Sequence, residues 1–185
     1  VLNYFRYYRS NSIIDDILST CTIKVIPILN PDGTEQYTRH NANGIDLNRD
    51  AIHRTECETC HFFKCLEEFK PDFCFNMHGQ RTIFSAGHKD KPATMSFLAP
   101  SLDYSLSVNE NREQSMKLIA AASALLSEYI PFQIGKYDDA YNPNCFGDHI
   151  QNLGISTVLF EAGHYQNDYN RNTVRKFVSL SLFKM

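Results

Sequence analysis

The sequence predicts an α/β fold in which helices sandwich a β-sheet. Three segments are rich in apolar and β-branched residues at both parities, which is typical of strands covered on two faces: residues 22–29, 72–77 and 155–160. Segments with apolar residues at helical spacing alternate with these strands. An alternation of strands and helices indicates a layered α/β sheet.

The expected elements follow one another in a single domain that spans residues 1–185. The expected helices are residues 1–20 with a Ser-Asn-Ser break, 56–69, 109–130, 148–153 and 168–183. The buried stripe of the longest helix is predicted to consist of Leu118, Ile119, Ala122, Leu125, Leu126 and Tyr129. Short extended segments are expected at residues 82–86 and 96–99, and a polar loop at 135–147.

Composition excludes several classes of protein. Lys and Arg total 18 against 21 Asp and Glu, so no basic surplus indicates nucleic acid as a partner. No apolar run approaches the roughly 20 residues that cross a bilayer. The chain begins at Val1 within a helical pattern, so we expect a fragment whose true start is missing. Cys21 and Cys74 accompany apolar strand patterns, which favours buried free thiols and a cytoplasmic protein.

A long polar segment follows the first expected strand. Residues 30–49, NPDGTEQYTRHNANGIDLNR, begin with turn formers and contain Arg39, Asn48 and Arg49. The planar guanidinium of Arg binds carboxylate and carbonyl oxygens in pairs. This segment, which we call the arginine loop, is therefore suited to a ligand that carries a carboxylate and a carbonyl.

Polar residues also stand at the carboxyl ends of the other two strands. His78 follows the second strand and Glu161 the third. Because sites in α/β sheets form beyond the carboxyl ends of strands, we expect His78, Glu161 and the arginine loop to meet in one site. Each residue also has an ordinary alternative: a core histidine, a helix cap or surface ion pair, and for Arg49 an ion pair with Asp46 or Asp50.

Together these motifs resemble the zinc metallocarboxypeptidases, the carboxypeptidase A-like family. The resemblance rests on NPDG, the run R-x-N-x-x-G-x-D-L-N-R at 39–49, and the strand-end residues His78 and Glu161, in the family's order. The sequences FKPDFCFNMHGQRTIFSAG and GISTVLFEAGHYQNDY are similar to a bacterial branch. The resemblance covers residues 22–161. It implies a mixed, mostly parallel sheet between helices, with the chain forming the C-terminal two-thirds or so of one catalytic domain, incomplete at its N-terminus.

The resemblance implies a hydrolase that removes a carboxyl-terminal residue from a peptide, or cleaves an N-acyl amino acid, through a zinc-activated water. His78 would be a zinc ligand and Glu161 the general base. Arg39 would polarise the scissile carbonyl, and Asn48 and Arg49 would bind the substrate carboxylate.

The family also uses a mobile tyrosine that covers the substrate. Tyr137 and Tyr141 are both available, and counting back from Glu161 favours Tyr141. Gly147 and Asp148 are both candidates for the position that selects the departing side chain. The side-chain preference of the enzyme therefore stays open.

The family takes two further zinc ligands from an H-x-x-E motif before the NPDG strand, and residues 1–21 contain no histidine. We therefore expect one catalytic Zn²⁺ whose other two ligands lie upstream of Val1, and a fragment that is inactive and poorly folded alone. Three alternatives remain: an N-acyl amino acid deacylase, a peptidase of cell-wall peptides, and a non-catalytic carboxylate-binding relative without the metal.

Two further motifs lie in residues 53–65. His53 and Glu56 have the H-x-x-E spacing, but they follow the arginine loop instead of preceding it. Residues 57–61, CETCH, match the haem attachment pattern or, with Cys65, a structural zinc site. The ordinary alternative for both motifs is a capped helix start with cysteines one turn apart.

Overall fold

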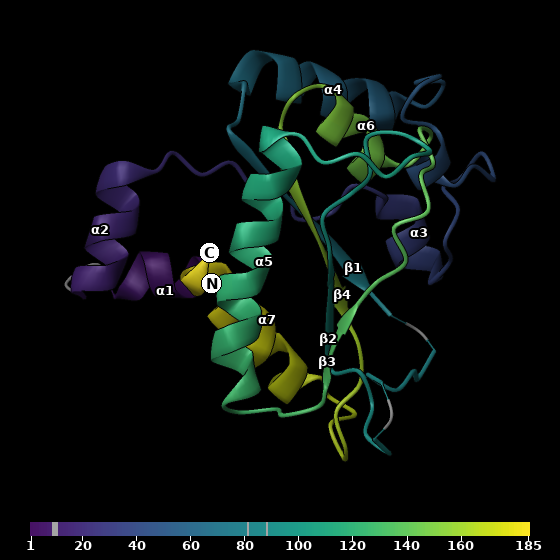
Figure 1. The fold of residues 1–185 in the computed structure, drawn as a ribbon. Coiled ribbons are helices and arrows are strands. Elements are labelled where there is room, and N and C mark those ends of the chain that lie inside the picture. The colour runs from purple at the N-terminus through teal and green to yellow at the C-terminus, as the bar shows by residue number, and fades with distance from the viewer. Residues whose placement is uncertain (9–10, 81, 88) are drawn as a thin grey trace.

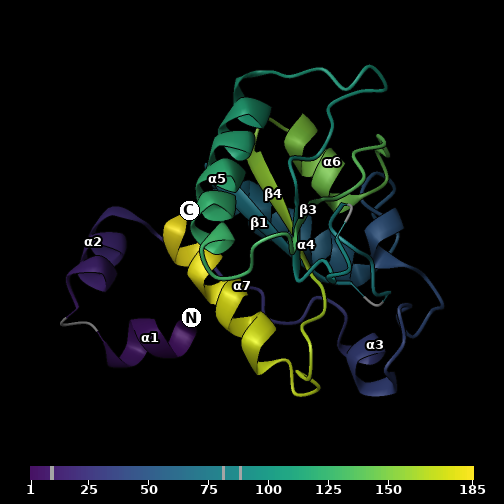
Figure 2. The same ribbon diagram turned by 60° about the horizontal axis from the view of Figure 1, so that its bottom comes forward.

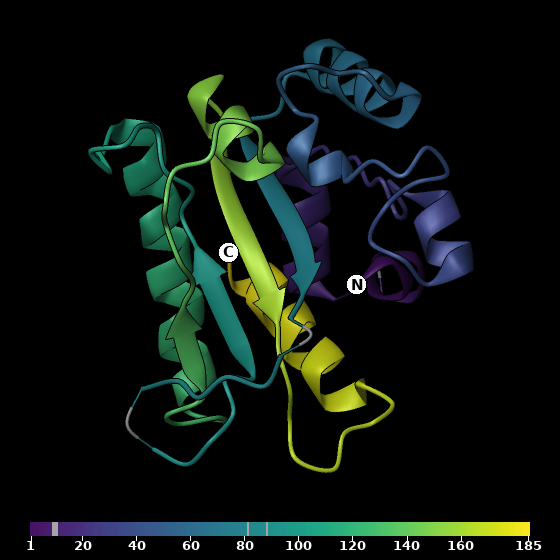
Figure 3. The ribbon, with the colours of Figure 1, turned by 90° about the vertical axis from the view of Figure 1, so that its right-hand side faces the viewer.

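The computed structural model describes residues 1–8, 11–80, 82–87 and 89–185 (Figure 1). Its sheet contains four strands: β1 (Phe73–Gly79), β2 (Met95–Leu98), β3 (Ile134–Lys136) and β4 (Ser156–Ala162). They lie side by side in the order β1-β4-β2-β3 (Figure 3). β1 is parallel to β4 and β2 to β3, whereas β2 and β4 are antiparallel. The predicted mixed, mostly parallel sheet is confirmed.

Helices cover both faces of this sheet. α5 (Glu110–Ser127) and α7 (Asn172–Lys184) lie on one face, and α4 (Cys57–Phe69) and α6 (Phe146–Asn152) on the other (Figures 1 and 2). The larger apolar cluster lies between the sheet and the helices α5 and α7. It consists of Met95, Phe97, Ala122, Leu126, Ile130, Val158, Phe160, Val174 and Phe177. A smaller cluster joins α4 and α6 through Ala51, Phe63, Phe146 and Ile150. The alternation of side chains along β4 explains how one strand serves both layers.

Two short helices, α1 (Leu2–Tyr7) and α2 (Ser12–Thr20), precede the sheet and extend away from it (Figure 1). The Asn11 side chain caps α2 by accepting a hydrogen bond from the backbone N–H of Ile13 at 3.1 Å. The rings of Tyr4 and Phe5 meet the ring of Phe183 edge-on, at centroid distances of 5.7 and 5.8 Å. The predicted helical region with an internal break is thus present, and it is attached to the body through α7.

The predicted strand at residues 22–29 is wrong. These residues form no strand, and the side chains of Ile23, Val25, Ile26 and Ile28 are between 41% and 55% exposed. A strand forms only where a neighbour accepts and donates its backbone hydrogen bonds. Within the described residues no strand pairs with this segment, so it does not form a strand despite its apolar, β-branched sequence.

β1 lies at an edge of the sheet and is covered on one face only. Phe73, Phe75 and Met77 are 46%, 38% and 47% exposed, although the sequence predicts a strand buried on both faces. The alternate residues of β1, including His78, point to the face that carries α6. The uncovered side chains explain why hydrophobicity alone misjudged the burial of this strand.

The remaining differences concern element ends and short strands. The 82–86 segment contributes only an isolated bridge between Ser85 and Pro92, and β3 falls partly within the predicted 135–147 loop. α5 ends at Ser127, before the predicted end at residue 130; beyond it, Tyr129 is 56% exposed, although the sequence predicts it in the buried stripe, and Ile130 is buried. None of the helices in the described ranges has both the length and the hydropathy needed to cross a membrane.

Replacing Leu126 with Ala is expected to lower the free energy of unfolding by about 2–5 kcal/mol, because the fully buried side chain leaves a cavity beneath α5. Tyr129→Ala removes an exposed ring and is expected to change that free energy by less than about 0.5 kcal/mol. Urea denaturation of both variants measures the difference. Equal losses would contradict the buried stripe assigned to α5.

Candidate active site

A cavity of about 330 Å³ lies between the arginine loop, the strand ends and α6. Its walls contain five of the six residues predicted from sequence: Arg39, Asn48, Arg49, His78 and Glu161. The other lining residues are Leu98, Pro100, Tyr137, Asp138, Ala140, Asn142, Cys145, Gly147, Asp148 and Leu159. The structure therefore brings predicted site residues from three distant parts of the chain, at 39–49, 78 and 161, to one cavity.

His78 and Glu161 are placed together by the sheet itself. They are paired across the parallel β1 and β4 ladder, and therefore lie on the same face. The His78 Nε2 atom is buried and has no hydrogen-bond partner in the described part of the chain. Burial, and then repulsion by the Arg39 and Arg49 guanidinium groups, lowers the pKa of His78. Both effects favour the neutral imidazole, which is the form that ligates metals.

Glu161 is a buried carboxyl group on the cavity wall. Burial raises the pKa of Glu161, and the nearby Arg39 guanidinium partly opposes this effect. A carboxyl group with a raised pKa holds and releases protons closer to neutral pH than an exposed one. Such a group is suited to proton transfer with a molecule in the cavity.

One carboxylate joins Arg39 to the short turn that carries Asn48 and Arg49. Asp46 Oδ2 accepts a hydrogen bond from Arg39 Nε at 2.7 Å, and Asp46 Oδ1 accepts one from the backbone N–H of Asn48 at 3.0 Å. The second contact caps η1, the short 3₁₀ turn Leu47–Arg49. Asp46 thus fixes Arg39 relative to the turn that carries Asn48 and Arg49. From the sequence, Asp46 is only a candidate ion-pair partner for Arg49, whereas in the structure it pairs with Arg39.

Arg49 and Asn48 are held against the start of α6. Arg49 Nη1 donates to the backbone oxygen of Asn48 at 2.7 Å and contacts Cys145 Sγ at 2.9 Å. Asn48 Oδ1 accepts a hydrogen bond from the backbone N–H of Phe146 at 2.9 Å. Because its oxygen is engaged, the Asn48 side chain presents its NH₂ group as a donor. Both residues therefore present donors to the cavity, where a carboxylate would accept them.

The start of the arginine loop folds as α3 (Pro31–Gln36), a single capped turn and a half. Asn30 Oδ1 accepts from the Gly33 N–H at 2.8 Å, and Pro31 occupies the first helical position. A Cβ atom on Gly33 would lie 2.8 Å from the backbone oxygen of Thr38, so this position requires glycine. The NPDG sequence is therefore explained by local backbone packing.

A buried acid anchors the middle of the loop. Glu56 Oε2 accepts hydrogen bonds from Asn41 Nδ2 at 2.6 Å and Asn43 Nδ2 at 2.7 Å. Asp50 in turn accepts from the backbone N–H groups of Thr55 and Glu56 at 2.9 and 3.0 Å. The Glu56 of the H-x-x-E motif thus binds side-chain amides.

Tyr141 does not line the cavity. Its hydroxyl accepts a hydrogen bond from Asn152 Nδ2 at 2.8 Å, and its ring meets the Tyr104 ring edge-on at 5.0 Å. Tyr137, the other candidate, is in the wall. Burial, followed by the negative charges of Glu161 and Asp138, raises the pKa of Tyr137. The position of Tyr137 near Glu161 could not be inferred from residue spacing.

Gly147 and Asp148 both line the cavity. Asp148 accepts hydrogen bonds from the backbone N–H groups of Ser101 at 2.8 Å and Asn142 at 3.3 Å, and burial raises its pKa despite them. A Cβ atom on Gly147 would lie 3.1 Å from the Pro100 ring. The structure thus keeps both residues as candidates for contact with a ligand side chain.

The described residues supply only part of a metal site. A catalytic zinc ion uses three protein ligands, whereas no group of three or more His, Cys, Asp or Glu side chains in the described ranges can hold a metal ion. The unpartnered Nε2 atom of His78 fits one ligand position. A complete zinc site therefore requires ligands from outside the residues that the structure describes.

The cysteine motif forms the first turns of α4. Cys57 Sγ donates to Glu58 Oε2 at 3.2 Å and Cys60 Sγ to the backbone oxygen of Arg54 at 3.0 Å. His61 Nδ1 contacts the Cys57 backbone oxygen at 2.6 Å. These contacts are those of an ordinary helix start, and the motif contributes to no metal-holding group among the described side chains.

Comparisons with known proteins agree with this geometry. The family model described as zinc carboxypeptidase matches residues 1–97, just over half of the chain. No curated protein matches the chain in sequence. Solved structures with a similar fold include a protein assigned as a carboxypeptidase A from Shewanella denitrificans, with a TM-score of 0.73 and 16% identity over 99% of this chain. A metallo-carboxypeptidase from Burkholderia cenocepacia has a TM-score of 0.66 and 16% identity over 96% of this chain.

A third similar structure is a metallo-carboxypeptidase from Pseudomonas aeruginosa in complex with (2-guanidinoethylmercapto)succinic acid, with a TM-score of 0.60 and 15% identity over 85% of this chain. The aligned regions cover 49%, 46% and 42% of these three proteins. The chain thus spans about half the length of the solved structures that it matches. At these identities the likeness concerns the fold.

Glu161→Gln is expected to raise the free energy of unfolding at neutral pH. Because burial raises the pKa of Glu161, the folded chain binds this proton more tightly than the unfolded chain, in which the pKa of Glu is about 4.3. Ionisation above the folded-state pKa therefore destabilises the fold, and this loss disappears below about pH 4. Urea titrations at pH 7 and at about pH 4 measure the difference in the free energy of unfolding between the variant and the parent protein.

The matched control is Glu68→Gln on the exposed side of α4, which is expected to leave the free energy of unfolding unchanged at both pH values. A gain for Glu161→Gln that is the same at pH 7 and at about pH 4 would contradict the electrostatic origin of the effect.

Proposed function

Because the chain belongs to the zinc carboxypeptidase family, we propose that it forms part of an enzyme that hydrolyses the carboxyl-terminal peptide bond of its substrate. The observation that carries the proposal is the cavity shared by Arg39, Arg49, His78 and Glu161. Two cations, a neutral imidazole and a carboxyl group of raised pKa are the groups that this reaction requires at one place.

Arg49 and Asn48 bind the free carboxylate of the substrate. The contacts of Arg49 Nη1 with the Asn48 backbone and Cys145 fix the direction of the guanidinium group. The Asn48 NH₂ group adds a neutral donor beside it. Recognition of a terminal carboxylate by a positioned fork of donors restricts cleavage to the end of the peptide.

Arg39 binds the scissile carbonyl. Asp46 holds the Nε edge of its guanidinium group, so the Nη edge is the part that can accept a developing negative charge. This interaction strengthens as the carbonyl oxygen becomes an oxyanion. Arg39 therefore acts on the rate of the reaction more than on the affinity for substrate.

Glu161 takes a proton from the attacking water and delivers it to the departing amine. Its raised pKa brings it closer to the pH at which both transfers are feasible. Zinc, when bound, supplies the Lewis acidity that makes water a nucleophile near neutral pH. His78 would be one ligand of this ion, and the proposal requires two more from outside the described residues.

Tyr137 is our candidate for the tyrosine that covers the substrate. It lines the cavity and lies close enough to Glu161 for the charge of that carboxylate to raise the pKa of the Tyr137 phenol. Tyr141 stays the alternative favoured by residue spacing, and its hydroxyl is engaged with Asn152. The substrate is a peptide or an N-acyl amino acid with a free carboxylate.

A second candidate is a non-catalytic module that binds carboxylates through the arginine loop. It rests on the donors of Arg49 and Asn48 in the cavity wall, which can bind a carboxylate without a metal. The two candidates differ in zinc content and in turnover. A complete protein that binds a peptide carboxylate but neither binds zinc nor cleaves the peptide would be the module.

In the complete zinc-loaded protein, Glu161→Gln is expected to lower kcat by at least about 10²-fold, because Gln cannot transfer the proton. Zinc content, measured by elemental analysis, is expected to stay unchanged because Glu161 is not proposed as a ligand. Glu68→Gln serves as the control. Peptidase activity of Glu161→Gln equal to that of the parent protein would refute the assignment.

Substitutions of the two arginines are expected to change different steady-state parameters. Arg49→Met should raise KM by roughly tenfold to a hundredfold through loss of the ion pair with the substrate carboxylate, with a smaller effect on kcat. Arg39→Met should lower kcat by about 10²–10³-fold, because it removes an oxyanion donor. The opposite pattern would exchange the two roles.

A further inference from the structure

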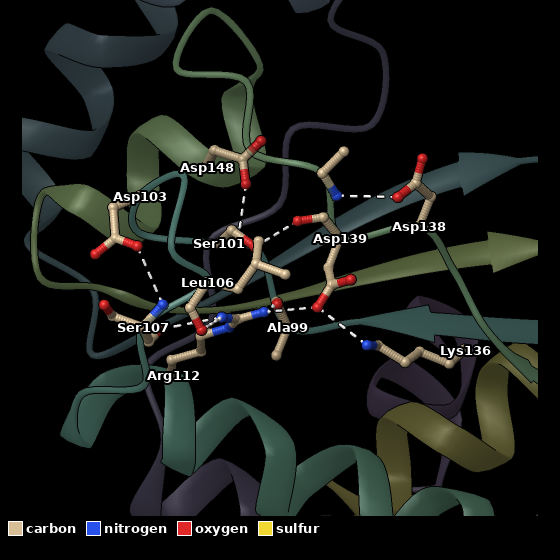
Figure 4. Close-up of polar contacts among 11 residues, drawn as sticks. Ala99, Ser101, Asp103, Leu106, Ser107, Arg112, Lys136, Asp138, Asp139 and Asp148 are labelled. Atoms are coloured by element: carbon tan, nitrogen blue, oxygen red, sulfur yellow. Dashed lines mark hydrogen bonds and ion pairs between the residues drawn. The ribbon is translucent and has the colours of Figure 1, made fainter.

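The largest side chain buried in the described fold is a charged one. Arg112, in the first turns of α5, is 1% exposed. Its Nε donates to the backbone oxygen of Ala99 at 3.2 Å, and its Nη1 donates to those of Leu106 and Ser107 at 2.6 and 3.0 Å (Figure 4). Its Nη2 forms an ion pair with Asp139 Oδ2 at 3.0 Å. The guanidinium group is thus bonded to three separate segments of the chain.

Two of those three segments run beside or within the cavity wall. Ala99 lies between Leu98 and Pro100, which line the cavity, and Asp139 lies between Asp138 and Ala140, which also line it. The Tyr137 N–H donates to the Phe97 oxygen at 2.9 Å, which ties the end of β3 to the end of β2. Arg112 therefore sits directly behind the wall that carries Tyr137.

A second set of bonds continues from Asp139 to Asp148. Ser101 Oγ donates to the backbone oxygen of Asp139 at 2.6 Å, and the Ser101 N–H donates to Asp148 Oδ1 at 2.8 Å (Figure 4). Asp148 Oδ2 accepts from the Asn142 N–H at 3.3 Å. The position of Asp148 in the cavity is thereby coupled, through Ser101, to the segment that Arg112 holds.

The chemistry of this contact requires arginine. The planar guanidinium group has five donors in a rigid fork, and here it serves four acceptors in different directions. A lysine at the same place has three donors on one atom and cannot span them. Lys136 Nζ also contacts Asp139 Oδ2 at 3.0 Å, but its side chain is 71% exposed. An exposed ion pair of this kind contributes little to rigidity.

We propose that Arg112, with Asp139, is a positioning residue that sets the shape of the cavity wall formed by Tyr137 and Asp148, and thereby the choice of substrate side chain. The inference rests on the proposed peptidase function for its effect on substrates. It does not place Arg112 in contact with the substrate. Arg112 acts through the backbone of residues 99–107 and through Asp139.

The test compares Arg112→Lys with Lys136→Met in the complete zinc-loaded protein. Two peptides that differ only in their carboxyl-terminal side chain, one small and one large, give a ratio of kcat/KM values. This ratio does not depend on how much of the enzyme is folded. It is expected to change by roughly tenfold or more in Arg112→Lys, because small displacements of positioning groups have large effects, and to stay unchanged in Lys136→Met. An unchanged ratio in Arg112→Lys would overturn the inference.

Amide hydrogen exchange gives a second readout that needs no activity. Arg112→Lys is expected to accelerate exchange in residues 99–107 and 136–142 while β1 and β4 keep their protection. Acceleration throughout the sheet, or none in these segments, would overturn the inference. If the parent protein cleaves neither peptide, the proposed function fails and the exchange pattern alone decides the role of Arg112. If Arg112→Lys yields no folded protein, Asp139→Asn is measured in the same two ways with the same criteria.

Discussion

The parallel pairing of β1 with β4 is the constraint on which the rest of the site depends. It sets His78 opposite Glu161 in the ladder, although 82 positions separate them in the sequence. The other side chains of the cavity come from the arginine loop, from residues 137–145, from α6, and from the ends of β2 and β4. The arginine loop is held by Asp46 and by the contact of Asn48 with the start of α6. A slip of one residue between β1 and β4 would turn His78 away from the face that carries Glu161.

Charges at and around the cavity are arranged for function at the expense of stability. Burial raises the pKa of Glu161 and lowers that of His78, so each group is moved toward its neutral form. Neither shift strengthens the fold at neutral pH, and removal of such a group commonly stabilises a protein. Arg112 differs from both because four hydrogen bonds satisfy its charge. Its burial therefore supports the wall without leaving an unpaired cation in the interior.

Sequence patterns predicted the helices and the three principal strands unequally well. Residues 155–160 became β4, a largely buried inner strand, because it has a sheet neighbour on each side and helices over its faces. Residues 22–29 have the same β-branched, apolar character but form no strand, since no described segment offers them backbone hydrogen bonds. β1 is intermediate, paired at one edge and covered on one face. Hydrophobicity measures the tendency of a segment to be buried, whereas its neighbours decide whether burial happens.

The sequence by itself predicted the α/β class, most of the helices, and five of the site residues that line the cavity. For His78 and Glu161 the reason is that a polar residue at the end of an apolar strand can be read from periodicity. Arg39, Asn48 and Arg49 were predicted from their residue types, since the strand expected before them does not form. Only the tertiary structure decided which tyrosine lines the cavity. Tyr137 is bonded through its backbone to Phe97 at the end of β2, whereas the Tyr141 side chain contacts Tyr104 and Asn152. These contacts join separate parts of the chain and cannot be read from the spacing of the two tyrosines. The tertiary structure also decided the roles of Asp46 and Arg112. Asp46 binds Arg39 across a fold of the arginine loop, and the partners of Arg112 lie on other segments. Neither kind of contact leaves a sequence pattern from which it can be read.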